Sequence, residues 1–336
     1  MKRRMAARMA ICYDFDGTLS PRYMQEYGFF MGLPPKERKT FWQKSNALAR
    51  EKHADPILTY MLRMIEEAEH SGNMLGTTRR AFRAYGKNID FFDGVETWFE
   101  RITGYAEEQG IRLDHYIISS GLKEIVEGSK IGKYFKEIYA CSFLHGVNDA
   151  AKWPAQVVNF TTKTQYLFRI NKGSEDVSET ATVNGYIAPE NRPVPFSHMV
   201  YIGDGETDVP CMRLVKEQGG RSIAVYAPGK AKSHRTALDL FRDGRVNYVI
   251  PADYSEGKLL ENVVKGIVDV VVSHVRLRML SKAAVPIMQR SNVSVKSKNT
   301  NSGIVKEQGT GEVGNVPLID PSQSCPMVNV KSEGVV

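Results

Sequence analysis

Short apolar runs alternate with longer segments of helical spacing along most of the chain. Runs rich in apolar residues at positions 9–13, 116–118, 199–202, 222–226 and 246–250 have the length of buried β-strands. Between them, apolar residues recur at the spacing of helices that bury one face. This alternation is typical of an α/β fold with a parallel sheet, and we predict a core of five strands.

A helical segment interrupts the alternation after the first strand. Two helices that open at prolines are predicted at 34–50 and 56–70, and a third at 75–85. The apolar stripe of the second helix includes Ile57 and Tyr60, and we interpret it as a core face rather than a ligand site. The segment is therefore predicted to be a helical insertion and not part of the sheet.

The alternation of helix and strand resumes near residue 91. We predict a helix that ends at about residue 109 and another that begins at Lys123. Residues 139–160 are predicted to form a hairpin, because Gly, Asn and Asp at 146–149 lie between two apolar stretches. A loop-rich connection is expected at 174–198, where Gly and Pro are frequent.

A further helix is predicted between the hairpin and this connection. Thr161 or Thr162 is expected to cap it, and it contains Lys163 and ends at Lys172 and Gly173. A closing helix is predicted at about 259–280, with too many charges to span a bilayer.

Both ends of the chain are polar. The residues beyond Gln289 contain no Phe, Trp or Tyr and are rich in Ser, Asn, Gly and Lys, so we predict a disordered tail there. At the other end, a basic cluster supplies much of the net charge of +7, and we interpret it as a solvated tail rather than a nucleic-acid-binding arm. The cluster consists of Lys2, Arg3, Arg4 and Arg8.

Composition narrows the class of protein further. With 336 residues and 42% hydrophobic positions, the chain can form one large domain and a smaller inserted one. Acidic residues interrupt the first apolar run too early for a signal peptide, so we expect a cytoplasmic protein and no membrane partner. The 4 cysteines form no C-x-x-C pair, which argues against a disulfide framework and a thiolate zinc site.

Carboxylates follow two of the predicted strands. Asp14 and Asp16 end the first strand and are followed by Gly17 and Thr18, and the sequence G-D-G-E-T-D at 203–208 follows a later one. In an open parallel sheet the ligand crevice lies beyond the carboxyl ends of the strands, so both acidic groups are expected to meet there.

These residue types suit the hydrolysis of a phosphate ester. Asp14 can attack phosphorus to form an aspartyl-phosphate, while Asp16 protonates the leaving group and then deprotonates water. Carboxylates would repel a phosphate dianion, so a cation is required, and Asp204 with Asp208 offers the hard oxygen ligands that Mg²⁺ prefers. Asp204 is favoured as the direct ligand, and for Asp208 binding through a water molecule is the alternative.

The phosphate itself needs hydrogen-bond donors and positive charge. Glycines let backbone amides approach the phosphate closely, as at Gly17, Gly203 and Gly205. Ser119 at the end of the second strand is favoured as a hydroxyl donor, with Ser120 as the alternative and helix capping as the ordinary role of either. Lys163 is favoured as the cation, although Lys152 and Lys172 lie nearby in sequence.

Residues 9–250 resemble the haloacid dehalogenase (HAD) superfamily, whose four motifs appear here in the family's order. The first motif matches residues 14–19, the second matches 117–121, the third matches Lys163, and the fourth matches 203–208. The resemblance implies a Rossmann-like core with a helical cap at 20–90, and Mg²⁺ held by Asp14, the backbone carbonyl of Asp16, and Asp204. It implies a phosphate site that includes Gly17, Thr18, Ser119, Ser120, Gly121 and Lys163.

The order of the motifs is most similar to the phosphoserine phosphatase branch. Those enzymes typically carry Glu nine residues after the nucleophile to bind the substrate's amine, whereas this chain has Tyr23 there, and they often have Ser where Gly17 stands. The substrate is therefore not predicted. Arg22, Tyr23, Tyr27, Phe29 and Phe30 are candidates to line the opening of the site or to pack inside the cap.

The sequence thus predicts a Mg²⁺-dependent phosphatase acting on a small phosphorylated metabolite. The alternatives are a phosphotransferase with the same aspartyl-phosphate chemistry and a phosphate-binding protein without turnover. The predicted domains are a core at 1–19 and 91–285, a cap at 20–90, and a tail at 286–336. Nucleic acid is not expected as a partner, and the sequence leaves the oligomeric state open.

Overall fold

The computed structural model describes residues 7–71 and 75–296, with side chains described as far as residue 284. The chain divides into two units at Lys282, and the first of them contains the sheet described below. The predicted tail at 286–336 lies outside the described residues from 297 onward. Up to residue 296 it is helical instead, because the last helix continues to Lys296 rather than ending near residue 280.

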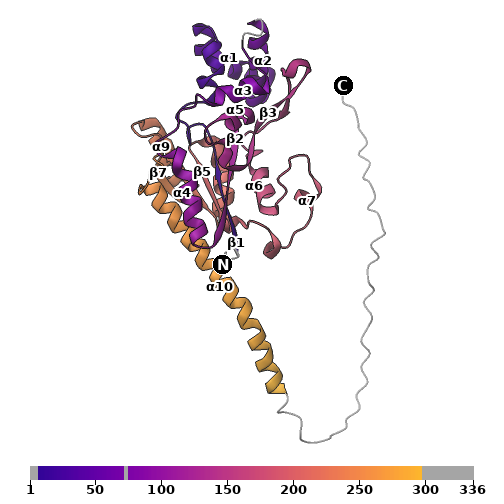
Figure 1. Ribbon diagram of the computed structural model, residues 1–336, viewed down its shortest axis with the longest axis vertical. Coiled ribbons are helices and arrows are strands. Elements are labelled where there is room, and N and C mark those ends of the chain that lie inside the picture. The colour runs from indigo at the N-terminus through magenta and orange to yellow at the C-terminus, as the bar shows by residue number, and fades with distance from the viewer. Residues whose placement is uncertain (1–6, 72–74, 297–336) are drawn as a thin grey trace, which may run out of the picture. The chain divides into compact units, whose positions relative to one another are not determined.

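A seven-stranded sheet forms the centre of the first unit, in the order β4-β3-β2-β1-β5-β6-β7 (Figure 1). All neighbouring strands are parallel except β3 and β4, which are antiparallel. The predicted α/β class is therefore confirmed. The strands are β1 (Ala7–Tyr13), β2 (Ile111–Leu122), β3 (Phe135–His145), β4 (Ala151–Gln156), β5 (Met199–Gly203), β6 (Arg221–Tyr226) and β7 (Tyr248–Pro251).

The prediction of five core strands was one too few. The first arm of the predicted hairpin, β3, pairs in parallel with β2 and is a sixth strand of the core. Its entry half is only partly buried and carries Lys136 and Glu137, so it lacks the continuous apolar run of a central strand. The turn at 146–149 and the antiparallel return strand β4 are as predicted.

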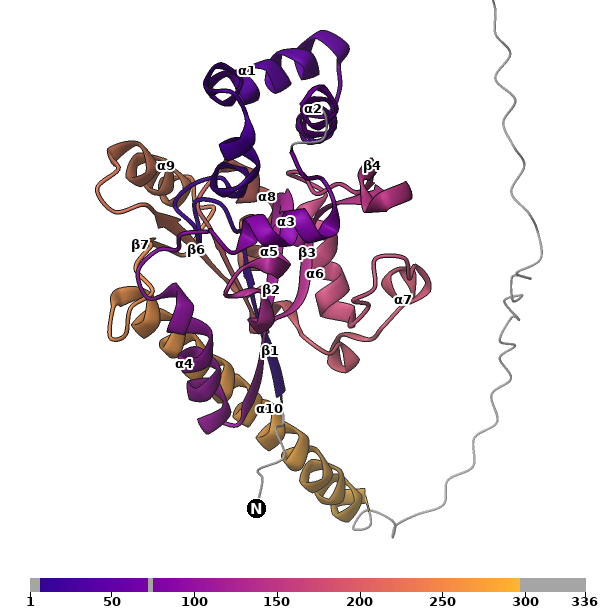
Figure 2. The same ribbon diagram turned by 45° about the horizontal axis from the view of Figure 1, so that its top comes forward.

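The middle of the sheet is fully buried. Residues Met9 to Tyr13 of β1, which lies between β2 and β5, have no exposed surface. Both faces of such a strand must be covered, and helices along the sheet cover them (Figures 1 and 2). These helices are α4 (Val95–Glu108), α5 (Lys123–Gly128), α6 (Lys163–Lys172), α8 (Val209–Glu217), α9 (Ala231–Arg242) and the first part of α10 (Leu259–Lys296), whose buried residues lie between Leu260 and Val271.

The connection from β1 to β2 contains the predicted helical insertion. It comprises two 3₁₀ turns, Met24–Tyr27 and Phe29–Gly32, and the helices α1 (Pro35–Lys52), α2 (Pro56–His70) and α3 (Arg79–Gly86). Asp55 caps α2, since its Oδ1 accepts the N–H of Ile57 at 2.7 Å, and a proline occupies the first turn.

Helix α3 packs against α5 of the core (Figure 2). The two helices approach closely at a pair of glycines. A Cβ atom on Gly128 would lie 2.0 Å from the carbonyl oxygen of Arg83, and one on Gly86 would lie 2.1 Å from that of Ile125. This contact fixes the end of the insertion on the core.

Helix α6 begins where the sequence predicts, but its cap differs. Thr162 is the N-cap residue, yet its side chain accepts no hydrogen bond from the helix; its Oγ1 accepts the N–H of Asn159 at 2.8 Å instead. Gly173 ends the helix in the left-handed conformation, as predicted. The connection at 174–198 contains one short α-helix, α7 (Ala181–Asn184), and two 3₁₀ turns, Pro189–Asn191 and Phe196–His198. Among the described residues we find no helix long and apolar enough for a bilayer.

Candidate active site

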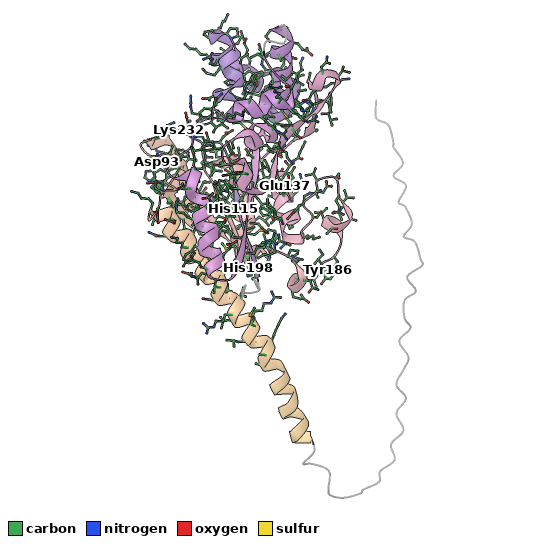
Figure 3. The ribbon with its side chains drawn as sticks, viewed as in Figure 1. Asp93, His115, Glu137, Tyr186, His198 and Lys232 are labelled. Atoms are coloured by element: carbon green, nitrogen blue, oxygen red, sulfur yellow. The ribbon has the colours of Figure 1, made fainter. Side chains whose placement is uncertain are left out.

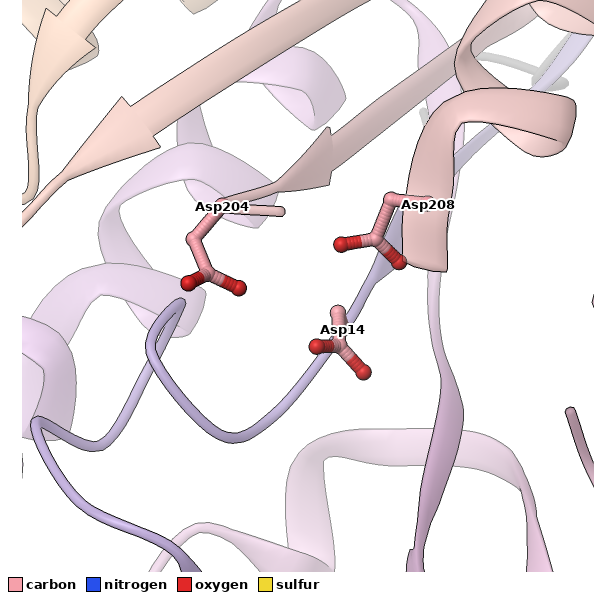
Figure 4. A group of neighbouring side chains, drawn as sticks. All are labelled: Asp14, Asp204 and Asp208. Atoms are coloured by element: carbon pink, nitrogen blue, oxygen red, sulfur yellow. The ribbon is translucent and has the colours of Figure 1, made fainter. Parts of the chain in front are cut away.

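Three carboxylates from two strand ends meet at the carboxyl edge of the sheet. Asp14 follows β1, and its backbone N–H donates to the carbonyl of Ile202 in β5 at 3.0 Å. Asp204 follows β5, and Asp208 lies in the 3₁₀ turn before α8. Oxygen atoms of the three side chains lie within 4.8 Å of one another (Figure 4). The structure thus brings together the acidic groups that lie far apart in sequence.

Lys163 joins this group from the first turn of α6. Its Nζ donates to Asp14 Oδ1 at 2.9 Å and to Asp208 Oδ1 at 2.8 Å, and the side chain is 1% exposed. Burial lowers the pKa of Lys163, but the two carboxylates outweigh burial, so the pKa lies above its ordinary value and the side chain stays charged. Lys152 is exposed, and Lys172 donates to two backbone carbonyls, so Lys163 is the lysine of the site.

The carboxylates outnumber this single buried cation. Burial and then the charge of Asp208 raise the pKa of Asp14, Lys163 opposes both, and the resulting pKa is about 6. Burial and then the Asp14 charge also raise the pKa values of Asp16 and Asp204 well above their ordinary range. A group of carboxylate oxygens that is short of positive charge fits a hard divalent cation such as Mg²⁺.

Asp208 is held by three donors. Its Oδ1 accepts the Tyr201 hydroxyl at 2.7 Å as well as Lys163, and its Oδ2 faces the N–H of Gly205 at 3.4 Å. This carboxylate therefore positions Lys163 and the loop at 203–208. Sequence reasoning missed Tyr201, because a tyrosine inside an apolar run is indistinguishable from a core residue.

Two glycines make room for these carboxylates. Gly17 has φ +81, and a Cβ atom there would lie 2.2 Å from Asp204 Oδ2. A Cβ atom on Gly203 would lie 2.5 Å from Asp208 Oδ2. The expected amide donation to phosphate is not seen at the first loop: the N–H of Gly17 donates to Ser20 and that of Thr18 to Phe15, and neither residue lines the cavity.

The two serines after β2 differ in their surroundings. Ser119 is 1% exposed, and its Oγ accepts the N–H of Gly121 at 3.1 Å, which leaves the hydroxyl proton free to donate. Ser120 Oγ has no hydrogen-bond partner among the described residues. Neither serine caps α5, whose N-cap is Leu122, so the capping alternative is wrong. Both serines and Gly121 line the cavity.

Asp16 lies beside the three carboxylates but outside their group. Its Oδ1 accepts the N–H of Met24 at 2.9 Å, which connects this side chain to the start of the helical insertion. Its carboxylate lines the cavity, as general acid–base chemistry requires. The ligand role predicted for its backbone carbonyl stays a prediction.

A cavity of about 660 Å³ opens above these residues, between the core loops and the helical insertion. Of the five residues considered for its opening, Tyr23 lines it and is 53% exposed. Tyr27, Phe29 and Phe30 are buried in the hydrophobic core, and Arg22 forms an ion pair with Asp90 at 3.0 Å. The other insertion residues at the cavity are Gln25, Trp42, Asn46, Pro56, Ile57 and Tyr60. The sequence assigned Ile57 and Tyr60 to a core face rather than a ligand site, and it gave the other four no role at the cavity.

Comparison with known proteins yields similarities at low sequence identity. No protein-family model matches the chain. An uncharacterized protein of Borreliella burgdorferi is 26% identical over 283 residues, covering 76% of this chain and 94% of that protein.

Solved structures with similarity to the chain include three hydrolases. A HAD family hydrolase from Salmonella enterica serovar Typhi has 17% identity and a TM-score of 0.47, covering 74% of this chain and 72% of that one. A phosphoserine phosphatase has 14% identity and a TM-score of 0.45, covering 72% and 93%. A cytosolic 5'-nucleotidase IIIB bound to cytidine has 15% identity and a TM-score of 0.45, covering 80% and 88%. Because these sequence identities and TM-scores are low, the functional conclusion depends on the residues of this chain.

Proposed function

We propose that this chain is a Mg²⁺-dependent phosphatase of the HAD type that hydrolyses a small phosphomonoester through a phosphorylated Asp14. The observation that carries the proposal is the meeting of Asp14, Asp204 and Asp208 within 4.8 Å around the buried Lys163. These residues belong to the four motifs that resemble those of the HAD superfamily and that follow one another in the family's order. In this proposal residues 20–90 act as the cap over the site, and the protein works in the cytoplasm.

The residues divide the chemistry between them. An oxygen of the Asp14 carboxylate bonds to phosphorus while the bond from phosphorus to the substrate oxygen breaks, and Asp16 gives its proton to the departing alcohol. Asp16 then takes a proton from water, whose oxygen attacks phosphorus and releases Asp14 and inorganic phosphate. Lys163 and the Ser119 hydroxyl donate to the phosphoryl oxygens, where negative charge must be balanced.

Asp14, Asp204 and the backbone carbonyl of Asp16 would hold the Mg²⁺ ion, and Asp208 would position Lys163 beside it. When bound, the ion supplies positive charge to the phosphoryl oxygens and lowers the repulsion between phosphate and carboxylates. The donor set fits this role, since the three side chains that meet here all offer carboxylate oxygens, which Mg²⁺ prefers.

The first experiment measures phosphate release from an aryl phosphate by the purified chain. We expect release with Mg²⁺ and none after chelation of Mg²⁺. Asp14→Asn should abolish turnover, whereas Asp243→Asn, at an exposed carboxylate, should leave it unchanged. Wild-type turnover by Asp14→Asn would refute the nucleophile assignment.

The acid–base role of Asp16 has its own test. In Asp16→Asn the leaving group lacks a proton donor and the phosphoenzyme lacks a base, so turnover should slow by roughly 10²-fold or more. With an aryl phosphate, whose leaving group needs little protonation, phosphoenzyme should accumulate and be visible by mass spectrometry of the intact protein. An unchanged steady-state rate would contradict this role. Transfer of phosphate to an added alcohol in place of water would instead identify a phosphotransferase.

A further inference from the structure

The cavity has two chemically different sides. The core loops contribute the phosphate-directed residues around Asp14 and Lys163. The helical insertion contributes the opposite side, which faces the leaving group of any phosphomonoester bound at Asp14. Substrate choice therefore depends on what the insertion presents, and this inference is built on the proposed phosphatase function.

The described residues of the insertion present no negative charge to the cavity. The described acidic residues that line it are Asp14, Asp16, Asp204 and Glu206, all from the core loops. Lys232 of α9 adds a positive charge at the opening; the residue is labelled in Figure 3. An ammonium group that lies against the described insertion residues would meet no carboxylate there, and burying an unpaired charge is costly.

Aromatic side chains form much of this side. The rings of Tyr23 and Trp42 lie 5.1 Å apart, and those of Trp42 and Tyr60 lie 5.5 Å apart. The Tyr60 hydroxyl donates to the carbonyl of Ser120 at 2.7 Å, so this tyrosine offers its ring rather than its hydroxyl. Phe160, which is 45% exposed, lines the cavity from the core. Such walls favour a flat, apolar ring over a small flexible alcohol.

Two uncharged polar residues of the insertion, Gln25 and Asn46, also line the cavity. Gln25 is 2% exposed and lines the cavity, and its Oε1 has no hydrogen-bond partner among the described residues. Leaving a buried acceptor unpaired costs free energy. Because the terminal torsion of Gln is soft, its amide can turn toward a ligand and accept from a donor on the ring.

We infer that the substrate is the phosphomonoester of a flat, uncharged ring alcohol that carries a hydrogen-bond donor, and that the site discriminates against ammonium-bearing phosphomonoesters. The aromatic walls of the insertion hold the ring, and Gln25 binds its polar edge. The core loops hold the phosphoryl group independently of the ring.

The test compares five phosphate compounds with the Mg²⁺-loaded full chain. Acetyl phosphate has no ring and reports the chemistry alone; phenyl phosphate adds the ring, and 3-carbamoylphenyl phosphate adds a donor. O-phosphoethanolamine and glycerol phosphate represent charged and flexible leaving groups. We expect kcat/KM to be highest for the carbamoylphenyl compound and lowest for O-phosphoethanolamine. Equal or higher kcat/KM for O-phosphoethanolamine would overturn the inference alone. No release from any compound, acetyl phosphate included, would overturn the proposed function with it.

Variants locate the preference in the cavity. Tyr23→Ala and Phe160→Ala, at partly exposed positions that tolerate truncation, should lower kcat/KM for phenyl phosphate roughly fivefold more than for acetyl phosphate. Gln25→Leu should reduce the advantage of the carbamoylphenyl compound over phenyl phosphate. The matched control is Tyr186→Ala, at an aromatic residue that is 87% exposed outside the cavity (Figure 3), which should change neither ratio. Equal losses on all five compounds in the cavity variants would contradict a ring-binding role.

Discussion

At the scale of single residues, the site depends on a position where a side chain would leave no room for a metal ligand. Gly17 lacks the Cβ atom that would lie 2.2 Å from Asp204 Oδ2, and its φ of +81 is one that other residues rarely adopt. Gly17 is therefore required for two reasons, the space that Asp204 occupies and the left-handed backbone. The two requirements can be separated, because the chain also contains glycines with similar φ and no close neighbours.

The first prediction uses that separation. Gly17→Ala should lower kcat by about 10²-fold or more, because the new methyl group displaces Asp204. Gly229→Ala is the matched control, since Gly229 has φ +76 but nothing within 4 Å of its Cβ position. Both variants should lose about 1 kcal/mol of stability to backbone strain in urea unfolding, and only Gly17→Ala should lose activity. Equal activity of the two variants would contradict the spatial role of Gly17.

A second residue, His115 in β2, is buried and does not line the cavity of the site; it is labelled in Figure 3. Tyr13 accepts the Trp98 indole N–H at 2.9 Å, so its own hydroxyl donates to His115 Nδ1 at 3.0 Å. The Nε2–H then donates to Thr103 Oγ1 at 2.9 Å. Neutral imidazole satisfies both bonds, and burial lowers the pKa of His115 to about 4.

The second prediction follows from that pKa. Below pH 6.5 the unfolded chain binds a proton at His115 that the folded chain does not bind until about pH 4. The contribution of His115 to stability is therefore complete above pH 6.5 and lost as pH falls to 4, by about 3 kcal/mol. The measurement is urea unfolding from pH 7 to 4 for wild type and His115→Gln. The difference between the two free energies should shrink with acid, and a constant difference would refute the buried neutral state.

At the scale of elements, sequence patterns predicted most helices and strands, and tertiary pairing decided the rest. Helices α1 and α2 lie where prolines and apolar spacing placed them. Strand β3 joined the parallel sheet although Lys136 and Glu137 break its apolar run, because its partner β2 supplies the register. No local pattern contains that information.

The contact between α3 and α5 is a second feature that no local pattern predicts, because it depends on two glycines in different helices. Gly128→Ala would place a methyl group 2.0 Å from the carbonyl oxygen of Arg83, so the helices must separate. We expect a loss of about 1–3 kcal/mol in unfolding free energy. The matched control is Gly104→Ala in α4, where nothing lies within 4 Å and a helical alanine should stabilise by about 0.5–1 kcal/mol. Stabilisation by both substitutions would show that α3 and α5 do not approach as described.

At the scale of the whole molecule, the core of the site was predictable because strand ends of a parallel sheet converge. Local motifs in the sequence identify Asp14, Asp204 and Lys163, and the sheet topology brings them together at the carboxyl edge of the sheet. The leaving-group side was not predictable, because Trp42 and Tyr60 lie on helices whose apolar residues have the spacing of a core face. Which of those residues face a cavity depends on how the insertion packs on the core, and the sequence carries no short-range signal for that.

This convergence also means that the cation site exists only in the folded chain, so Mg²⁺ binding and folding are linked. A ligand that binds only the folded state stabilises it by RT ln(1 + [L]/Kd), and we expect Mg²⁺ to raise the Tm of the wild type. Without metal, the raised pKa of Asp204 shows that its charge is unfavourable at neutral pH in the folded state. Asp204→Asn should therefore have a higher Tm than the wild type in chelator and gain little from Mg²⁺.

The comparison is made by calorimetry at pH 7.5, with and without Mg²⁺, and with Asp243→Asn as the control at an exposed carboxylate. The control should respond to Mg²⁺ like the wild type, because its carboxylate lies outside the group of three. The order of Tm values between wild type and Asp204→Asn should invert on adding metal, and general salt effects cannot produce an inversion in one variant only. An equal gain from Mg²⁺ in all three proteins would place the ion elsewhere and remove the basis for the proposed chemistry.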